Sequence, residues 1–240
     1  MTDVVPAIPA HEVEDRLTGL ILSRLRQALA LYLWDHRAVR VSSEDPFTLA
    51  SGNRSPIYVD CRRVISDPAF MRLYTGVAAL ILDRKEVAVD VVAGGETAGI
   101  PYGAVLAQSL GCPFVYVRKK PKGYGTSSRV EGDLADGSRV LLVEDLITDG
   151  GSKLGFLDAL EAVGAQVADV VVLFDRQQGG ESLLAERGVR LHAVTDRKTA
   201  FAVGNSSGLM TETDQLSCEE YFRDAKAWHD KRGYAWHDAG

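Results

Sequence analysis

Two adjacent acids followed by a turn of small residues form the most informative stretch of the sequence, RVLLVEDLITDGGSK at residues 139–153. The acids are Glu144 and Asp145, and the turn carries Thr148 and Ser152 around two glycines. Glycines let the main chain approach an anion closely, and the helix expected after the turn offers free N–H groups and a positive dipole end. The turn is therefore predicted to hold a phosphate monoester, although its spacing is not that of a P-loop.

The two carboxylates would repel that phosphate, so they need a different partner close by. The vicinal hydroxyls of a ribose can supply one, because each hydroxyl can donate a hydrogen bond to a carboxylate. A ligand with a phosphate at one end and a sugar diol next to it fits both halves of the stretch. The alternative is a pair of solvated acids at the end of a strand, followed by a glycine-rich turn.

A second charged segment, RKKPKGYGTSSRVEG at residues 118–132, carries four cations within five residues: Arg118, Lys119, Lys120 and Lys122. Its glycines give the main chain wide conformational freedom. Cations on a loop that closes over a site would stabilise a leaving anion and exclude water. The alternative is an ordinary solvated basic turn.

The middle of the chain predicts the scaffold for these residues. Strands that are apolar on both faces alternate with segments of helical length, which is typical of an α/β fold with a central, mostly parallel sheet and helices on both faces. The expected strands are 87–94, 113–117, 139–144, 167–175 and 189–194, and the expected helices are 68–83, 99–110, 152–163 and 180–187. In such sheets ligands bind beyond the carboxyl ends of the strands, here at the loops after Val92, Val117, Val143 and Phe174.

The flanks are expected to belong to the same unit, so that residues 1–240 form a single domain. Residues 1–65 are assigned to an N-terminal helix over 13–33 and a small hood with strand-like pieces at 47–49 and 57–60. Residues 66–200 form the α/β core. In the tail, residues 201–240, the SCEE stretch at 217–220 is expected to cap a short helix that ends before Gly233.

Composition narrows the class of protein. The chain has 240 residues, of which 46% are hydrophobic and 25% charged, as in ordinary globular proteins. A net charge of -6 argues against general nucleic-acid affinity. Three scattered cysteines suggest a reducing compartment, and no apolar run approaches the length of a membrane span. We expect a cytoplasmic protein with neither nucleic-acid nor membrane partners.

The stretch VLLVEDLITDGGS resembles the ribose-5-phosphate-binding signature of the type I phosphoribosyltransferases. This resemblance implies binding of 5-phosphoribosyl 1-pyrophosphate, with Glu144 and Asp145 on the 2- and 3-hydroxyls and the following loop on the 5-phosphate. The implied binding residues of that loop are Leu146, Ile147, Thr148, Asp149, Gly150, Gly151 and Ser152.

The basic loop is similar to the mobile loop of the orotate phosphoribosyltransferases. Arg118, Lys119 and Lys122 match that pattern by position, and the resemblance implies that they handle the pyrophosphate. Tyr124 stands where the family usually has His, and it is carried over as a donor-binding residue. The resemblance also implies a homodimer in which this loop reaches into the neighbouring subunit's active site.

Two further segments resemble the base-binding parts of the same family. FTLASGNRSPIYVDCR at residues 47–62 matches its SG-x-x-SP segment and places Tyr58, with Thr148, near orotate. Two positions depart from the pattern, because Ala50 and Ala98 stand where some members have Lys. Each departure affects one contact that the family's Lys would make, and the resemblance to the family remains.

Arg176 follows the strand expected at 167–175 and matches the arginine that pairs with the orotate carboxylate in the family. A planar guanidinium meets a carboxylate bidentately, which suits orotate better than neutral uracil. Taken alone, Asp175 and Arg176 could instead be a surface ion pair.

Taken together, the resemblance implies a Mg²⁺-dependent transfer of the phosphoribosyl group to N1 of orotate, giving orotidine 5'-phosphate and pyrophosphate in pyrimidine biosynthesis. Lys119, Glu144 and Asp145 are the expected catalytic residues. The Mg²⁺ is expected to be carried by the donor rather than by a cage of protein carboxylates. The alternatives are a purine-type phosphoribosyltransferase, or a non-catalytic regulator that senses the donor.

Overall fold

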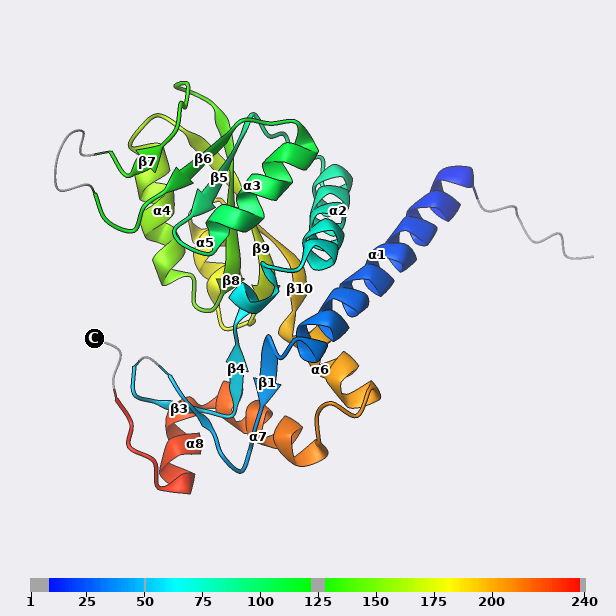
Figure 1. The fold of residues 1–240 in the computed structure, drawn as a ribbon, viewed down its shortest axis with the longest axis vertical. Helices are drawn as coiled ribbons and strands as arrows, with labels where there is room; N and C mark the ends of the chain where they lie inside the picture. The colour runs from blue at the N-terminus through cyan, green and yellow to red at the C-terminus, as the bar shows by residue number, and fades with distance from the viewer. Residues whose placement is uncertain (1–8, 50, 122–127, 238–240) are drawn as a thin grey trace, which may run out of the picture.

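The computed structural model describes residues 9–49, 51–121 and 128–237. Its centre is a six-stranded sheet with the strand order β10-β9-β8-β5-β6-β7 (Figure 1). All pairs in this sheet are parallel except the edge pair of β6 with β7. The strands are β5 Val91–Gly95, β6 Phe114–Val117, β7 Val130–Glu131, β8 Arg139–Ile147, β9 Gln166–Asp175 and β10 Arg190–Asp196. The predicted mostly parallel α/β sheet is confirmed.

Helices cover both faces of the sheet, and β9 shows how the sequence divides them. Val171 and Leu173 belong to the core under one layer, whereas Val170 and Val172 belong to the core under the other. The first layer holds α1 Ala10–Asp35, α2 Pro68–Arg84, α3 Gly99–Leu110 and α6 Arg197–Ser206. The second layer holds α4 Gly151–Glu161 and α5 Gly180–Glu186. Because β9 is buried on both faces, its sequence is a nearly continuous run of apolar residues.

β8 is longer than predicted, because it continues through the two acids to Ile147. Leu146 and Ile147 pair with Phe174 and Asp175 of β9, so the main-chain ladder does not stop at the first polar side chain. The expected strand end at Glu144 was wrong. Since successive side chains of a strand point to opposite faces, the two adjacent acids must diverge.

Residues 39–64 form the hood, which lies beside the carboxyl end of β8 (Figure 1). Two antiparallel pairs build it: β1 Val39–Val41 with β4 Ile57–Val59, and β2 Phe47–Thr48 with β3 Arg54–Ser55. A 3₁₀ turn, η1 Cys61–Val64, leads from β4 toward α2. The hood thus places residues 58–62 over the edge of the sheet at which the parallel strands end.

The tail folds back onto the hood as two helices, α7 Glu212–Arg223 and α8 Ala225–Arg232. His229 accepts a hydrogen bond from the N–H of Arg54, and Asn53 exchanges two hydrogen bonds with the main chain of His237. The SCEE stretch lies inside α7 instead of capping a helix, so that prediction was wrong. Thr211 caps α7 by accepting from the N–H of Asp214, and α8 ends before Gly233 as expected.

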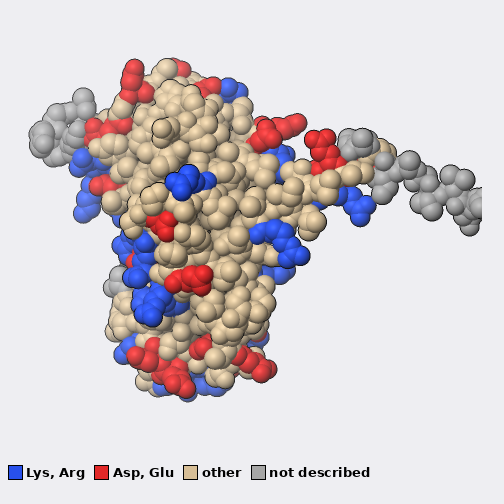
Figure 2. Space-filling model, turned by 45° about the vertical axis from the view of Figure 1, so that its right-hand side comes forward, with Lys and Arg blue, Asp and Glu red and all other residues tan. Residues whose placement is uncertain are grey.

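The surface carries one unusual element, the projecting first half of α1 (Figure 1). Leu17, Leu20 and Ile21 on this half are more than half exposed, although the sequence places them on an apolar stripe. Lys and Arg are interspersed with Asp and Glu on the face drawn in Figure 2. The three cysteines are free thiols. Within the described ranges, no helix is both long and apolar enough to cross a membrane.

Candidate active site

A cavity of about 280 Å³ opens where the hood meets the carboxyl ends of three neighbouring strands. The segments after β5 and β6, the acid pair of β8 and the first turn of α4 converge on it. Its lining consists of Val59, Asp60, Arg62, Glu96, Thr97, Ala98, Lys119, Glu144, Asp145, Leu146 and Lys153. The acid pair and Lys119 of the basic loop, which are distant in sequence, therefore share one site as predicted from the strand ends.

Glu144 occupies the deep side of this site and is only 5% exposed. Its Oε2 lies 2.5 Å from Nζ of Lys153 in the first turn of α4. A Cβ at Gly95 or Gly99 would collide with Oε1 of Glu144, so these two glycines make room for the carboxylate. Burial raises the pKa of Glu144, and the ammonium of Lys153 opposes that rise.

Asp145 faces the other side of β8, toward η1 and α3. Burial also raises the pKa of Asp145, with Lys153 and Arg62 opposing the rise. Among the described residues, Asp145 forms no ion pair within 4 Å, in contrast to Glu144. The two acids therefore differ in their partners: Glu144 has an ion pair with Lys153, and Asp145 has none among the described residues.

The basic loop enters the site through Lys119, whose N–H donates to Oε2 of Glu96 at 2.7 Å. This contact fastens the start of the loop to the segment after β5. The positive charge of Lys119 also opposes the rise in the pKa of Glu144. Arg118 turns the other way, to Glu131 of β7 at 3.7 Å. Two residues of the prediction, Lys122 and Tyr124, lie outside the described residues.

The proposed phosphate cradle lies at the start of α4. Gly150 has φ +87°, a left-handed conformation that favours glycine, and it leads directly into the first turn of the helix. Asp149 accepts a hydrogen bond from the N–H of Gly151, so one donor of this turn is already occupied. Ser152 is exposed and Thr148 is partly exposed, whereas the side chain of Ile147 is fully buried in the core. Only the main chain of Ile147 can face a ligand.

The base end is built from the hood and from the segment after β9. The guanidinium of Arg40 lies 5.0 Å from the ring centroid of Tyr58 and 5.1 Å from that of Phe47, and the two rings contact each other at 5.8 Å. Arg176 lies close to Phe222 of α7, 5.9 Å from the ring centroid, and its Nε is buried without a hydrogen-bond partner among the described residues. Burial lowers the pKa of Arg176, which marks a cation without a compensating anion in this part of the chain.

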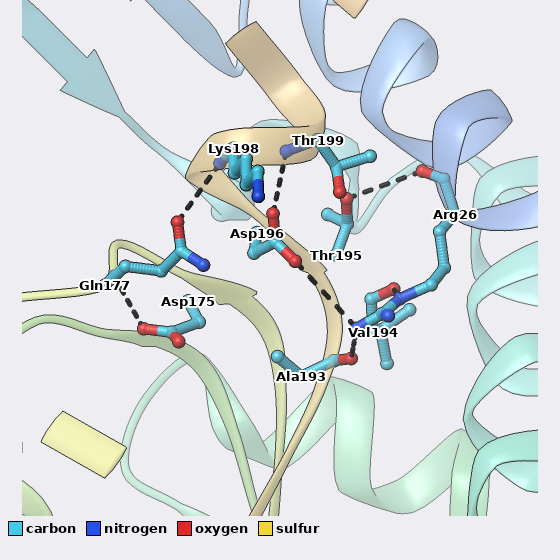
Figure 3. Close-up of polar contacts among 9 residues, drawn as sticks. All are labelled: Arg26, Asp175, Gln177, Ala193, Val194, Thr195, Asp196, Lys198 and Thr199. Atoms are coloured by element: carbon cyan, nitrogen blue, oxygen red, sulfur yellow. Dashed lines mark hydrogen bonds and ion pairs between the residues drawn. The ribbon is translucent and has the colours of Figure 1, made fainter. Parts of the chain in front are cut away.

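A set of capping hydrogen bonds fixes the segment that carries Arg176 (Figure 3). Asp175 accepts from the N–H of Gln177 at 2.7 Å, and the Gln177 side chain accepts from the N–H of Lys198. Asp196 in turn caps α6 by accepting from Thr199 N–H. Asp175 is thus engaged in a turn, and the alternative of an Asp175–Arg176 surface ion pair does not describe this structure.

Sequence reasoning missed several lining residues, and each carried a faint signal. Lys153 directly follows the Gly-Gly-Ser turn, where a cation at the positive end of a helix is unusual. Glu96 interrupts a run of small residues after β5. Asp60 and Arg62, paired at 2.6 Å, lie at the end of the hood segment that was selected for its Tyr58. Tyr58 and Arg176, in contrast, are not among the described residues that line this cavity.

Comparisons with known proteins agree with the arrangement. Residues 64–187, just over half of the chain, match the family described as the phosphoribosyl transferase domain. An orotate phosphoribosyltransferase of Cereibacter sphaeroides (strain KD131 / KCTC 12085) is 43% identical over 94% of both chains. The crystal structure of the orotate phosphoribosyltransferase from Aeropyrum pernix shares 36% identity and a TM-score of 0.65, covering 76% of this chain and 99% of that one.

A further solved structure is the Mycobacterium tuberculosis H37Rv enzyme in complex with 5-phospho-α-D-ribosyl 1-diphosphate, with 27% identity and a TM-score of 0.59 over 73% of this chain and 98% of that chain. The named relatives are orotate enzymes, which disfavours both the purine-type alternative and the regulator. The shared cavity of acids, cation and helix start, together with this similarity over nearly the whole chain, shows that the chain belongs to the orotate phosphoribosyltransferases of the phosphoribosyl transferase family.

Proposed function

We propose that the chain transfers the 5-phosphoribosyl group of 5-phosphoribosyl 1-pyrophosphate to N1 of orotate, releasing pyrophosphate and orotidine 5'-phosphate. The observation that carries this proposal is the cavity shared by Asp145, Glu144 and Lys119 next to the start of α4. A sugar diol, a phosphate and a departing pyrophosphate each find a partner of suitable charge around it.

The donor is positioned by the strand and the turn that follows it. Asp145 and Glu144 accept hydrogen bonds from the ribose hydroxyls, and the 5-phosphate lies over the first turn of α4. Donors for that phosphate come from Thr148, Ser152 and main-chain N–H groups over 146–151. Both carboxylates also stabilise the positive charge that develops on the sugar as the glycosidic bond breaks.

The leaving pyrophosphate is stabilised by the basic loop. Lys119 already lines the cavity of its own subunit. Arg118, Lys122 and Tyr124 are assigned to the pyrophosphate by position in the loop, and in a homodimer they would reach the neighbouring subunit's site. Assembly as a homodimer with shared sites, location in the cytoplasm and action as one domain over residues 1–240 are parts of the same proposal.

The residues around the cavity fit a Mg²⁺ ion that arrives with the donor. No group of three or more His, Cys, Asp or Glu in the described residues could hold a metal ion by itself. Asp145, whose carboxylate lacks an ion-pair partner there, is the residue that would approach such an ion through the ribose hydroxyls. When bound, Mg²⁺ neutralises charge on the pyrophosphate as the bond to the sugar carbon breaks.

Orotate binds between the hood and the segment after β9. Arg176 pairs with its carboxylate, and Tyr58 and Thr148 contact the ring. No side chain needs to remove a proton, because orotate reacts as its N1 anion.

The direct test is the ultraviolet absorbance of orotate on mixing with protein, donor and Mg²⁺. A decrease that requires all three additions and is reversed by pyrophosphate with orotidine 5'-phosphate is the expected result. An absorbance that stays constant at high protein concentration, with the donor still intact, would refute the proposed reaction.

A further inference from the structure

Lys153 is a buried cation placed against the electrostatic preference of its helix. It lies in the first turn of α4, where the N–H groups produce positive potential, and it is only 7% exposed. A lysine in that position is unfavourable unless a buried anion compensates for it. Its Nζ forms an ion pair with Oε2 of Glu144 at 2.5 Å.

Glu144 is equally dependent on this contact. Its Oε1 is buried beside Gly95 and Gly99 and has no hydrogen-bond partner among the described residues. Three charged groups act on the carboxylate: Lys153 from α4 and Lys119 from the segment after β6 favour its ionised form, while Asp145 on β8 opposes it. Without Lys153, burial and Asp145 would favour a protonated Glu144.

We propose that Lys153 is a positioning residue for donor binding, which holds Glu144 as an ionised carboxylate in one orientation at the deep side of the donor site. The inference rests on the proposed function. Lys153 acts on the two acids in different ways: it forms a direct ion pair with Glu144, and it acts on Asp145 only through a longer-range charge interaction.

Two other roles of Lys153 would look similar in a single variant. Lys153 could contact a phosphate of the donor directly, or the ion pair could serve only to hold α4 against β8. A double-mutant cycle separates these roles, because a residue that acts through Glu144 loses its effect once Glu144 cannot ionise.

The experiment measures donor affinity by calorimetry in Mg²⁺ from pH 6 to 9, together with kcat and KM, for Lys153→Met, Glu144→Gln, the double variant and the unchanged chain. Lys85→Met, an exposed lysine at the end of α2, is the matched control. Loss of a charge-assisted hydrogen bond should weaken donor binding by Lys153→Met about tenfold or more at pH 7. In the Glu144→Gln background the same change should alter affinity far less, because only the longer-range effect of the ammonium on Asp145 remains.

The inference also predicts in which direction the loss of donor affinity changes with pH. Removing the ammonium raises the pKa of Glu144 further, so a larger fraction of the carboxylate is protonated at the lower end of the pH range than at the upper end. The ratio of variant to unchanged Kd should therefore fall as pH rises, and its pH dependence should be much weaker in the Glu144→Gln background. The same ratio with Lys85→Met should be close to one throughout.

Three results would overturn the inference. An equal loss of affinity from Lys153→Met in both backgrounds would mean direct contact with the donor, and a pH-independent ratio would remove ionisation of Glu144 from the explanation. Unchanged donor affinity with a lower melting temperature would leave Lys153 a structural role. If Lys153→Met does not fold, the neutral double variant should; its donor affinity must then match that of Glu144→Gln alone. Failure of the unchanged chain to consume orotate would instead refute the proposed reaction.

Discussion

At the scale of single residues, the site assigns different tasks to cations that look equivalent in the sequence. Lys119 and Lys120 are adjacent and both exposed, yet only Lys119 lines the cavity. A donor aimed at charge that develops in the transition state contributes to turnover rather than to binding of the ground state. Lys119→Ala is therefore expected to lower kcat by about 100- to 1000-fold while changing donor affinity much less.

Lys120→Ala is the control for this prediction, since it removes a neighbouring charge outside the cavity. Steady-state kinetics and calorimetry on both variants give the comparison. Equal losses of kcat and donor affinity in Lys119→Ala would move this lysine to ground-state binding.

Arg176 is the residue on which recognition of orotate depends. Its Nε is buried without a partner in the described part of the chain, so a ligand carboxylate would meet a guanidinium that has already lost its water. Arg176→Lys keeps the charge and loses the planar pair of donors, and we expect KM for orotate to rise by roughly 10- to 100-fold with donor KM nearly unchanged.

Arg187→Lys, directly after α5, provides a matched substitution, because the ion pairs of Arg187 in the described part of the chain are with two exposed acids, Asp158 and Glu161. Competition by uracil should also become relatively stronger in Arg176→Lys. An unaltered KM for orotate would remove Arg176 from the base site.

At the scale of secondary-structure elements, the sheet was predictable and the connections between layers were not. Each strand of the core is a run of apolar residues bounded by turn residues, which is a local signal. The continuation of β8 past Glu144 depends on main-chain pairing with β9, which no local pattern encodes. Likewise the Lys153–Glu144 pair, α6 and the two tail helices depend on what packs against them, and short helices with few apolar residues give weak periodicity.

A cluster of aromatic side chains packs the two tail helices against each other. Trp228 is 2% exposed, stacks edge-to-face on Tyr221 and donates from Nε1 to Ser217. Trp228→Ala removes this contact area and one of the two hydrogen bonds that Ser217 Oγ accepts, and should lower the free energy of unfolding by about 3–5 kcal/mol. Chemical denaturation followed by circular dichroism measures the change.

Leu216→Ala on α7 is the control, because Leu216 is 56% exposed and should shift the free energy by less than about 1 kcal/mol. The hood exchanges hydrogen bonds with α8 and the residues after it, so we also expect Trp228→Ala to raise KM for orotate more than KM for the donor. A variant as stable as the unchanged chain would show that the cluster is dispensable.

At the scale of the whole molecule, the question is which groups belong to one subunit's site. Lys119 and the two acids line one cavity within a single chain, so one cation of the basic segment lies at the site of its own chain. Arg118 instead pairs with Glu131 of β7 and is not among the residues that line that cavity. If the loop is shared between two subunits, Lys119 would stay at the site of its own chain and the later cations of the loop would serve the partner's site.

Sharing of sites between subunits predicts complementation. Asp145→Asn and Lys122→Ala should each be nearly inactive as homodimers, because every site then lacks either a sugar-binding carboxylate or a loop cation. If Lys122 acts in the partner's site, a hybrid dimer has one site with both defects and one with neither. Random mixing makes half of the dimers hybrid, so activity should recover to about a quarter of that of the unchanged protein.

The measurement is the orotate assay after reversible dissociation and mixing of the two variants. Mixing Asp145→Asn with Lys119→Ala is the control. If Lys119 acts in its own subunit, one site of that hybrid lacks Asp145 and the other lacks Lys119, so no activity should return. Recovery in the second mixture would contradict the assignment of Lys119 to the site of its own subunit. No recovery in the first mixture would contradict the assignment of Lys122 to the partner's site.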